Sequence, residues 1–161
     1  MRAFVLHGHG GLDQLRFHAD GPTPSPGVGE ALIRVRACGL NNTDINTRTG
    51  WYSKAVREAT SRGTYNGDLD KDGGWDGGIE FPRIQGGDAA GIVVRVGEGV
   101  DEALIGQRCP VDPIVRDWSD PASIEKTSYL GSARDGFSAK PELAIIPDAD
   151  ACGEPVASCG A

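Results

Sequence analysis

The sequence contains no long hydrophobic run and no excess of positive charge. No apolar stretch approaches the ~18 residues that a membrane-spanning helix requires, and the apolar part of Met1–Gly8 is too short for a secretory signal. The formal net charge of −7 argues against non-specific binding to nucleic acids, which depends on basic surface. We therefore predict a cytoplasmic protein that has no membrane or nucleic-acid partner.

Cysteines are few and widely separated: they are Cys38, Cys109, Cys152 and Cys159. No two of them have the close spacing of a structural zinc knuckle. Disulfides are not expected, because the sequence shows no secretory signal. Cys38 and Cys109 lie in strand-like runs, so we predict that they are buried thiols.

Aromatic residues make up only 6% of the chain, whereas glycine occurs 24 times and proline 10 times. This composition favours many short strands and turns over long helices. The length of 161 residues fits one compact domain. Strands are expected at residues 2–6, 15–18, 30–38, 92–96, 109–113 and 143–147. We therefore predict a mainly β fold with a few short helices, built as a small barrel or sandwich.

A cluster of polar side chains follows the clearest predicted strand, residues 30–38. Within that strand apolar residues alternate with arginines, which indicates one buried and one exposed face. Gly39 permits an abrupt strand end, and Asn41–Asp44 are residue types that start helices by accepting from free backbone amides. Helix signal continues over residues 44–59, with an interruption at Thr49-Gly50. The cluster is therefore either a strand end with a helix cap or the wall of an active site.

Residues 61–80 form a glycine-rich, polar stretch that predicts a long surface loop, and a second polar loop is expected over residues 116–135. The first stretch contains aspartates spaced as in the first half of a calcium-binding loop, with Gly73 at the sharp turn. These aspartates are Asp68, Asp70, Asp72 and Asp76. The closing glutamate comes one position late, at Glu80, and glycine and proline interrupt both flanking helices. A calcium-binding module is thus an alternative to a solvated loop.

Three segments, at residues 1–6, 26–44 and 82–100, follow one another in a familiar order. The second reads Pro-Gly-Val-Gly-Glu before the strand and Cys-Gly-Leu-Asn-Asn-Thr-Asp after it, and the third contains Gly-Gly-Asp-Ala-Ala-Gly. In this order they resemble the medium-chain dehydrogenase/reductase superfamily, which includes the zinc-type alcohol dehydrogenases and the quinone oxidoreductases. The resemblance spans residues 1–147. It implies a GroES-like, partly open β-barrel that forms the substrate-side (catalytic) domain, with an irregular tail at residues 148–161.

The zinc ligands of that superfamily are largely missing from this sequence. Zinc-dependent members have a cysteine at the position of Asn41 and a histidine-glutamate pair at the positions of Gly87 and Asp88. Catalytic zinc needs about three protein ligands and an open position, but only Asp88 remains. Cys38 lies three residues before Asn41 along a strand, so it faces the opposite side. We therefore expect no zinc site.

The remaining pattern resembles the zinc-free branch that includes quinone oxidoreductases. This resemblance implies direct hydride transfer between NADP or NAD and a small carbonyl or quinone substrate. It implies catalytic roles for Asn41, which orients the substrate carbonyl or the cofactor, for Asp44, which braces the turn, and for Tyr52, which closes one side of the pocket. Asn42 and Thr43 would join Asn41 in contacting the cofactor. An ordinary half-buried core tyrosine is the alternative for Tyr52.

No Gly-x-Gly-x-x-Gly turn between a strand and a helix, the signature of a dinucleotide-binding Rossmann domain, occurs in the sequence. The glycines at 8–11 and at 97–99 indicate hairpin turns instead. We therefore expect that the chain alone, as a truncated family member, does not hold a dinucleotide in the superfamily's usual way. Whether it is an enzyme or a non-catalytic GroES-like barrel stays open at this point, and so does the question of a homodimer.

Overall fold

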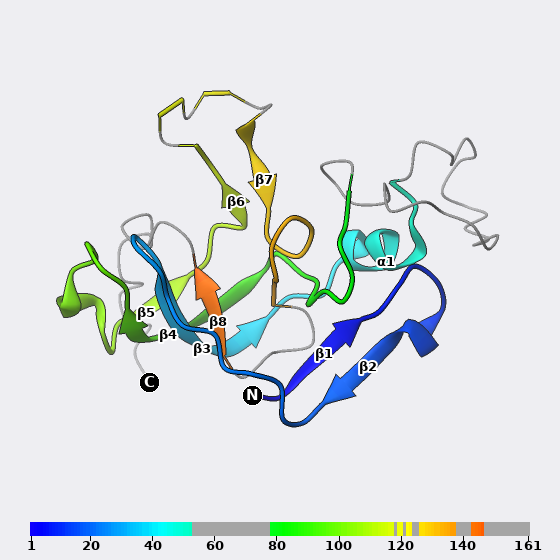
Figure 1. Ribbon diagram of the computed structural model, residues 1–161, viewed down its shortest axis with the longest axis horizontal. Coiled ribbons are helices and arrows are strands. Elements are labelled where there is room, and N and C mark those ends of the chain that lie inside the picture. Colours follow the sequence, from blue (N-terminus) through cyan, green and yellow to red (C-terminus); the bar gives the residue numbers. More distant parts are fainter. Residues whose placement is uncertain (53–77, 118, 121, 124–125, 138–142, 147–161) are drawn as a thin grey trace, which may run out of the picture.

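Three small antiparallel sheets and one α-helix form the fold in the computed structural model (Figure 1), which describes residues 1–52, 78–117, 119–120, 122–123, 126–137 and 143–146. The largest sheet has the strand order β5-β4-β3-β8. Its strands are β3 (Ala31–Cys38), β4 (Ala89–Val96), β5 (Arg108–Pro110) and β8 (Leu143–Ile146). The predicted mainly β fold class is confirmed, and the described strands form open sheets, consistent with the partly open barrel that was expected.

Two shorter ladders accompany the large sheet. The strand β1 (Ala3–Leu6) pairs with β2 (Leu15–His18), and β6 (Ile114–Val115) pairs with β7 (Ser128–Tyr129). The helix α1 spans Asn42–Thr49 and lies beside the far end of the β1–β2 hairpin in Figure 1. Single turns of 3-10 helix occur at Leu12–Gln14 and Glu102–Leu104. No helix in the described part of the chain is long and apolar enough to cross a membrane.

The hydrophobic core is built on β3. Ala31, Ile33 and Val35 are buried and Arg34 and Arg36 are exposed, as the alternation predicts. The alternation fails at both ends of the strand, where Leu32 is buried and Ala37 is exposed. Their buried partners are Val93, Val100, Cys109, Leu130 and Phe137. Full burial of such a side chain stabilises a fold by roughly 1.5–3 kcal/mol. The core residues of β3 therefore fix the position of the strand end that leads into α1.

The register between β3 and β4 brings two distant segments together. A bulge between Val35 and Ala37 places Cys38 opposite Ala89. As a result, the residues just after β3 lie beside those just before β4, and the Gly39 amide donates to the Asp88 carbonyl oxygen at 3.0 Å. The polar cluster after β3 is thus joined to residues 85–88.

The structure differs from the sequence prediction in two loops. The stretch 116–135, predicted to be a polar loop, contributes the strand β7 and the buried side chain of Leu130. A ladder of two residues per strand is too short to show a hydrophobic period, so the pattern could not reveal it. In the stretch 61–80 only residues 78–80 are described, and Ile79 is buried. The calcium-loop candidates Asp68, Asp70, Asp72 and Asp76 lie outside the described residues, and that alternative stays a prediction.

Two histidines meet on the β1–β2 hairpin. The Nε2 atoms of His7 and His18 are 3.0 Å apart, and the ring planes are nearly parallel at 15°. The ring centroids are 5.3 Å apart, so the rings meet end to end through an N–H···N hydrogen bond. Burial lowers the pKa of His7, and the neighbouring charges of Arg16 and His18 lower it further. The neutral form of His7 is therefore favoured in the folded protein.

This pair predicts a pH-dependent stability. A histidine pKa that is lower when folded than the usual ~6.5 means that the unfolded chain binds more protons, so stability falls as the pH drops through that range. The variant His7→Gln should lose less stability than the parent chain between about pH 7 and about pH 5. Urea unfolding at both pH values tests this, and an unchanged pH dependence in the variant would contradict it.

Candidate functional site

The polar cluster after β3 forms the N-terminus of α1. The Asn41 Oδ1 atom accepts from the Thr43 amide at 3.0 Å, and the Asp44 carboxylate accepts from the Asn41 amide at 2.9 Å. This reciprocal arrangement is a capping box, which satisfies two amides that have no partner within the helix. It explains why asparagine and aspartate stand three positions apart. It also starts the helix at Asn42, two residues earlier than the predicted helix signal.

The nitrogen of the Asn41 side-chain amide bonds to Asp88. This Nδ2 atom donates to the Asp88 Oδ2 atom at 2.5 Å, a charge-assisted hydrogen bond. Gly39 makes the close approach possible, because a Cβ atom there would lie 2.9 Å from the Asp88 Cβ atom. Asn41 is therefore held in one orientation, with its oxygen in the cap and one N–H on Asp88. An asparagine amide has a second N–H, which no described residue accepts.

A buried glutamine fixes α1 to the segment before β4. The Gln85 side chain is 4% exposed, and its Nε2 atom donates to the Asp44 carbonyl oxygen at 3.0 Å. Thr47, one turn later in α1, is also buried. The bonds from Gln85 and Asp88 hold α1 at two points, so the geometry of the cluster does not depend on the helix alone.

A small cavity opens beside this junction. Its wall is rich in hydroxyl groups and includes a run of glycines. It is lined by Thr43, Asp44, Thr47, Tyr52, Gly86, Gly87, Tyr129, Leu130, Gly131 and Ser132. Three of the residues named by the resemblance to the superfamily, Thr43, Asp44 and Tyr52, are among them, whereas Asn41 and Asn42 are exposed at the helix start. Their roles there stay predictions.

Sequence reasoning missed Tyr129 and Ser132 in this wall, because both fall in the predicted polar loop. Burial raises the pKa of the Tyr129 phenol, and the nearby groups Asp88, Asp44, Tyr52 and Asp112 raise it further. These surroundings favour the protonated form of the phenol. No local motif marks either residue, since their neighbours in space come from distant parts of the chain.

The side chains present do not fit a zinc ion. Within the described ranges, no three histidine, cysteine, aspartate or glutamate side chains are close enough to hold a metal. The Asn41 and Asp88 side chains bond to each other, and Gly87 has no side chain to offer a metal. Three protein ligands are the usual requirement for catalytic zinc.

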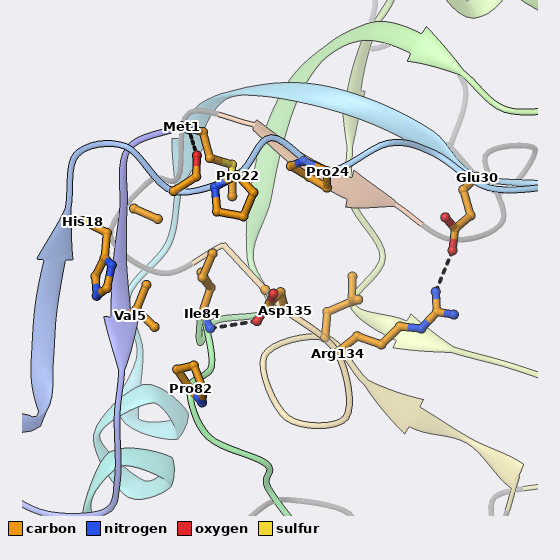
Figure 2. Close-up of a pocket in the computed structure, with 14 residues that line it drawn as sticks. Met1, Val5, His18, Pro22, Pro24, Glu30, Pro82, Ile84, Arg134 and Asp135 are labelled. Atoms are coloured by element: carbon orange, nitrogen blue, oxygen red, sulfur yellow. Dashed lines mark hydrogen bonds and ion pairs between the residues drawn. The ribbon is translucent and has the colours of Figure 1, made fainter.

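A larger cavity of about 500 Å³ lies elsewhere, between the β1–β2 hairpin and the loop that follows β7 (Figure 2). Its wall is mostly apolar, with Val5, Pro22 and Ile84 among its residues. The charged groups at its rim are already paired: Arg134 with Glu30 at 2.8 Å, and Asp135 with Arg83 and the Ile84 amide. None of Asn41, Asp44 and Tyr52 lines it. It offers volume without reactive groups, so we place the candidate site at the smaller cavity.

The family model described as alcohol dehydrogenase GroES-like domain matches residues 27–140. The chain belongs to this family, within the medium-chain dehydrogenase/reductase superfamily. The superfamily resemblance seen in the sequence is thereby confirmed.

Similar proteins include both dehydrogenases and a vesicle protein. A solved alcohol dehydrogenase of Sinorhizobium meliloti is 41% identical, with a TM-score of 0.72, over 91% of this chain and 38% of that one. The rat synaptic vesicle membrane protein VAT-1 homolog is 33% identical over 69% of this chain and 22% of its own length. Rat quinone oxidoreductase is 30% identical over 67% of this chain and 26% of its own. The GroES-like chain thus spans about a quarter of these curated relatives.

Replacement of Asn41 by aspartate should separate the two functions of its amide. The new carboxylate keeps the acceptor for Thr43 but loses the donor to Asp88, and it places two carboxylates side by side. Such a pair shares one proton with a raised pKa, so the folded state gains protons as the pH falls. We expect Asn41→Asp to be destabilised by roughly 1–2 kcal/mol at neutral pH and to regain stability toward about pH 5.

The matched variant is Asn41→Ala, which removes both the cap and the donor. It should lose about 1 kcal/mol with little added pH dependence, because it introduces no charge. Chemical unfolding of both variants at the two pH values measures the difference. Equal pH dependence in the two variants would show that Asn41 and Asp88 are not in contact.

Proposed function

We propose that this GroES-like domain is the substrate side of a zinc-independent, NAD(P)H-dependent oxidoreductase that reduces small carbonyl or quinone compounds by direct hydride transfer. The observation that supports it is the fixed Asn41 amide. One of its N–H groups bonds to Asp88, and no described residue accepts the other, beside a cavity lined by hydroxyl groups. Hydride addition to a carbonyl places negative charge on the oxygen, and fixed donors stabilise that charge without a metal.

The nicotinamide would supply the hydride when bound. Asn42 and Thr43 lie at the exposed or half-buried start of α1, next to Asn41, and are the residues of this chain that would contact it. Asp44 acts through its neighbour, because its carboxylate holds the Asn41 backbone in the cap. Tyr52 forms part of the cavity wall and excludes water there. Asn41 would then orient the substrate oxygen.

The described part of the chain offers no usual site for the rest of a dinucleotide. All its strand pairs are antiparallel, whereas the pyrophosphate of NAD(P) binds at a parallel strand-turn-helix unit. The relatives are longer than this chain, which covers 22% to 38% of those compared above. The proposal therefore assigns pyrophosphate binding to protein outside the described residues.

A chimera tests the proposal directly. This chain replaces the matching part of the Sinorhizobium meliloti dehydrogenase, which it resembles at 41% identity, and the remainder of that protein is kept. We expect the chimera to oxidise NADH or NADPH with an aldehyde or a quinone, and to do so equally with a metal chelator present. Asn41→Ala in the chimera should lower kcat/KM by about two orders of magnitude, the effect of removing one oxyanion donor.

The control is Ile105→Ala, a change at an exposed side chain far along the chain from the cavity. It should leave kcat/KM within about twofold. A folded chimera that oxidises neither nucleotide with any acceptor would reject the proposal in favour of a non-catalytic barrel. Loss of activity on chelation would reject the zinc-independent route.

A further inference from the structure

The β1–β2 hairpin brings two imidazole nitrogens together at a place that the proposed function does not use. His7 directly follows β1, and His18 is the last residue of β2. Their Nε2 atoms are 3.0 Å apart, and both side chains are half-buried, so dissolved ions can reach them. Neither residue lines the smaller cavity, and His18 lies beside the larger one (Figure 2). Imidazole nitrogens are common protein ligands of transition metals.

The backbone holds the two histidines in place. The His7 amide donates to the Gln14 carbonyl oxygen at 2.9 Å. The amides of Leu6 and Arg83 donate to each other's carbonyl oxygens at 2.8 and 2.9 Å. His18 is fixed by the ladder, in which it stands opposite Ala3. The short distance between the two imidazoles therefore follows from the hairpin, and a ligand set on such rigid elements is preorganised.

The separation of the two nitrogens distinguishes between metals. Bonds from a metal to imidazole nitrogen are about 2.0–2.1 Å long. Two such bonds at a right angle place the nitrogens about 2.8–3.0 Å apart, whereas a tetrahedral angle places them about 3.3–3.4 Å apart. The observed 3.0 Å fits the right angle. That angle is typical of Cu²⁺ and Ni²⁺ in square-planar or tetragonal sites, and Zn²⁺ prefers the tetrahedral one.

Binding requires a small rearrangement of the pair. The rings meet end to end, so one Nε2 atom carries the hydrogen that the two share. The metal-bound form has this hydrogen on Nδ1 of the same ring, and both rings turn until their lone pairs converge on the ion. Both imidazoles are neutral before and after, so no proton is released. Burial and the Arg16 charge favour neutral His7, which is the form that binds metals.

We propose that His7 and His18 form a site for one Cu²⁺ or Ni²⁺ ion, with water in the remaining coordination positions. The site is separate from the proposed function and does not depend on it. A catalytic zinc site needs three protein ligands, whereas two ligands hold an ion that exchanges readily with solvent. The bound ion links β1 to β2. It stabilises the folded chain, because the unfolded chain does not keep the two imidazoles together.

Urea unfolding with increasing Ni²⁺ tests the proposal. Ni²⁺ is the probe because cysteine thiols reduce Cu²⁺ and the chain contains four cysteines. The 161-residue chain, without a histidine tag, is used at about pH 7.5, where imidazole is neutral. Its unfolding equilibrium constant should fall about 100-fold when Ni²⁺ reaches 100 times the Kd. His7→Gln and His18→Gln should each weaken Ni²⁺ binding at least tenfold, no less than the loss of a supporting partner does in other sites.

Two further variants separate this site from other effects. His9→Gln changes the third histidine of the chain and should keep the full response to Ni²⁺. Arg16→Gln removes a positive charge near His7 and should tighten Ni²⁺ binding roughly threefold, because like charges repel.

Three results would overturn the proposal. The first is a parent chain that millimolar Ni²⁺ does not stabilise. The second is a His18→Gln variant that Ni²⁺ stabilises as much as the parent, because the ion would then bind elsewhere. The third is tighter binding of Zn²⁺ than of Ni²⁺, which contradicts the right-angled geometry. None of these results affects the proposed function, since neither histidine lines the smaller cavity.

Discussion

The hydrogen bond between Asn41 and Asp88 is the constraint on which the rest of the site depends. It joins the start of α1 to the start of β4, two segments that the chain separates by a long polar stretch. Because the bond uses one N–H of the amide and the cap uses its oxygen, the last N–H has a defined direction. An amide in an exposed loop would have no such direction, and it could not select one position for a substrate oxygen.

Few other residue types would fit at the positions around this hydrogen bond. Gly39 allows Asp88 to approach, Gln85 ties α1 to the same segment, and Gly87 leaves space for the Tyr129 phenol. These three residues position their neighbours and do not themselves react. The candidate site thus has a fixed polar geometry. In the proposed function, that geometry takes over the polarising role that a metal has in zinc-dependent members of the superfamily.

The sequence predicted the parts of this arrangement that depend on local patterns. The alternation in β3 and the capping residues Asn41 and Asp44 each act within a few positions, so the strand and the helix start could be located. The approach of Tyr129 to Gly87 could not be found in this way, because the two residues are far apart in the sequence. The pairing of His7 with His18 was missed for the same reason, since the twist of a hairpin decides which side chains meet.

The central claim is that the Asn41 amide is held by Asp88 and offers its second N–H to a carbonyl oxygen. Nuclear magnetic resonance of the Asn41 side-chain amide, assigned by comparison with Asn41→Asp, measures this most directly. We expect one of the two amide protons to be shifted from the position of a solvent-exposed asparagine by the bond to Asp88, and the other to shift when an aldehyde is added. Two protons at the positions of a solvent-exposed asparagine, neither of which responds to the aldehyde, would contradict this.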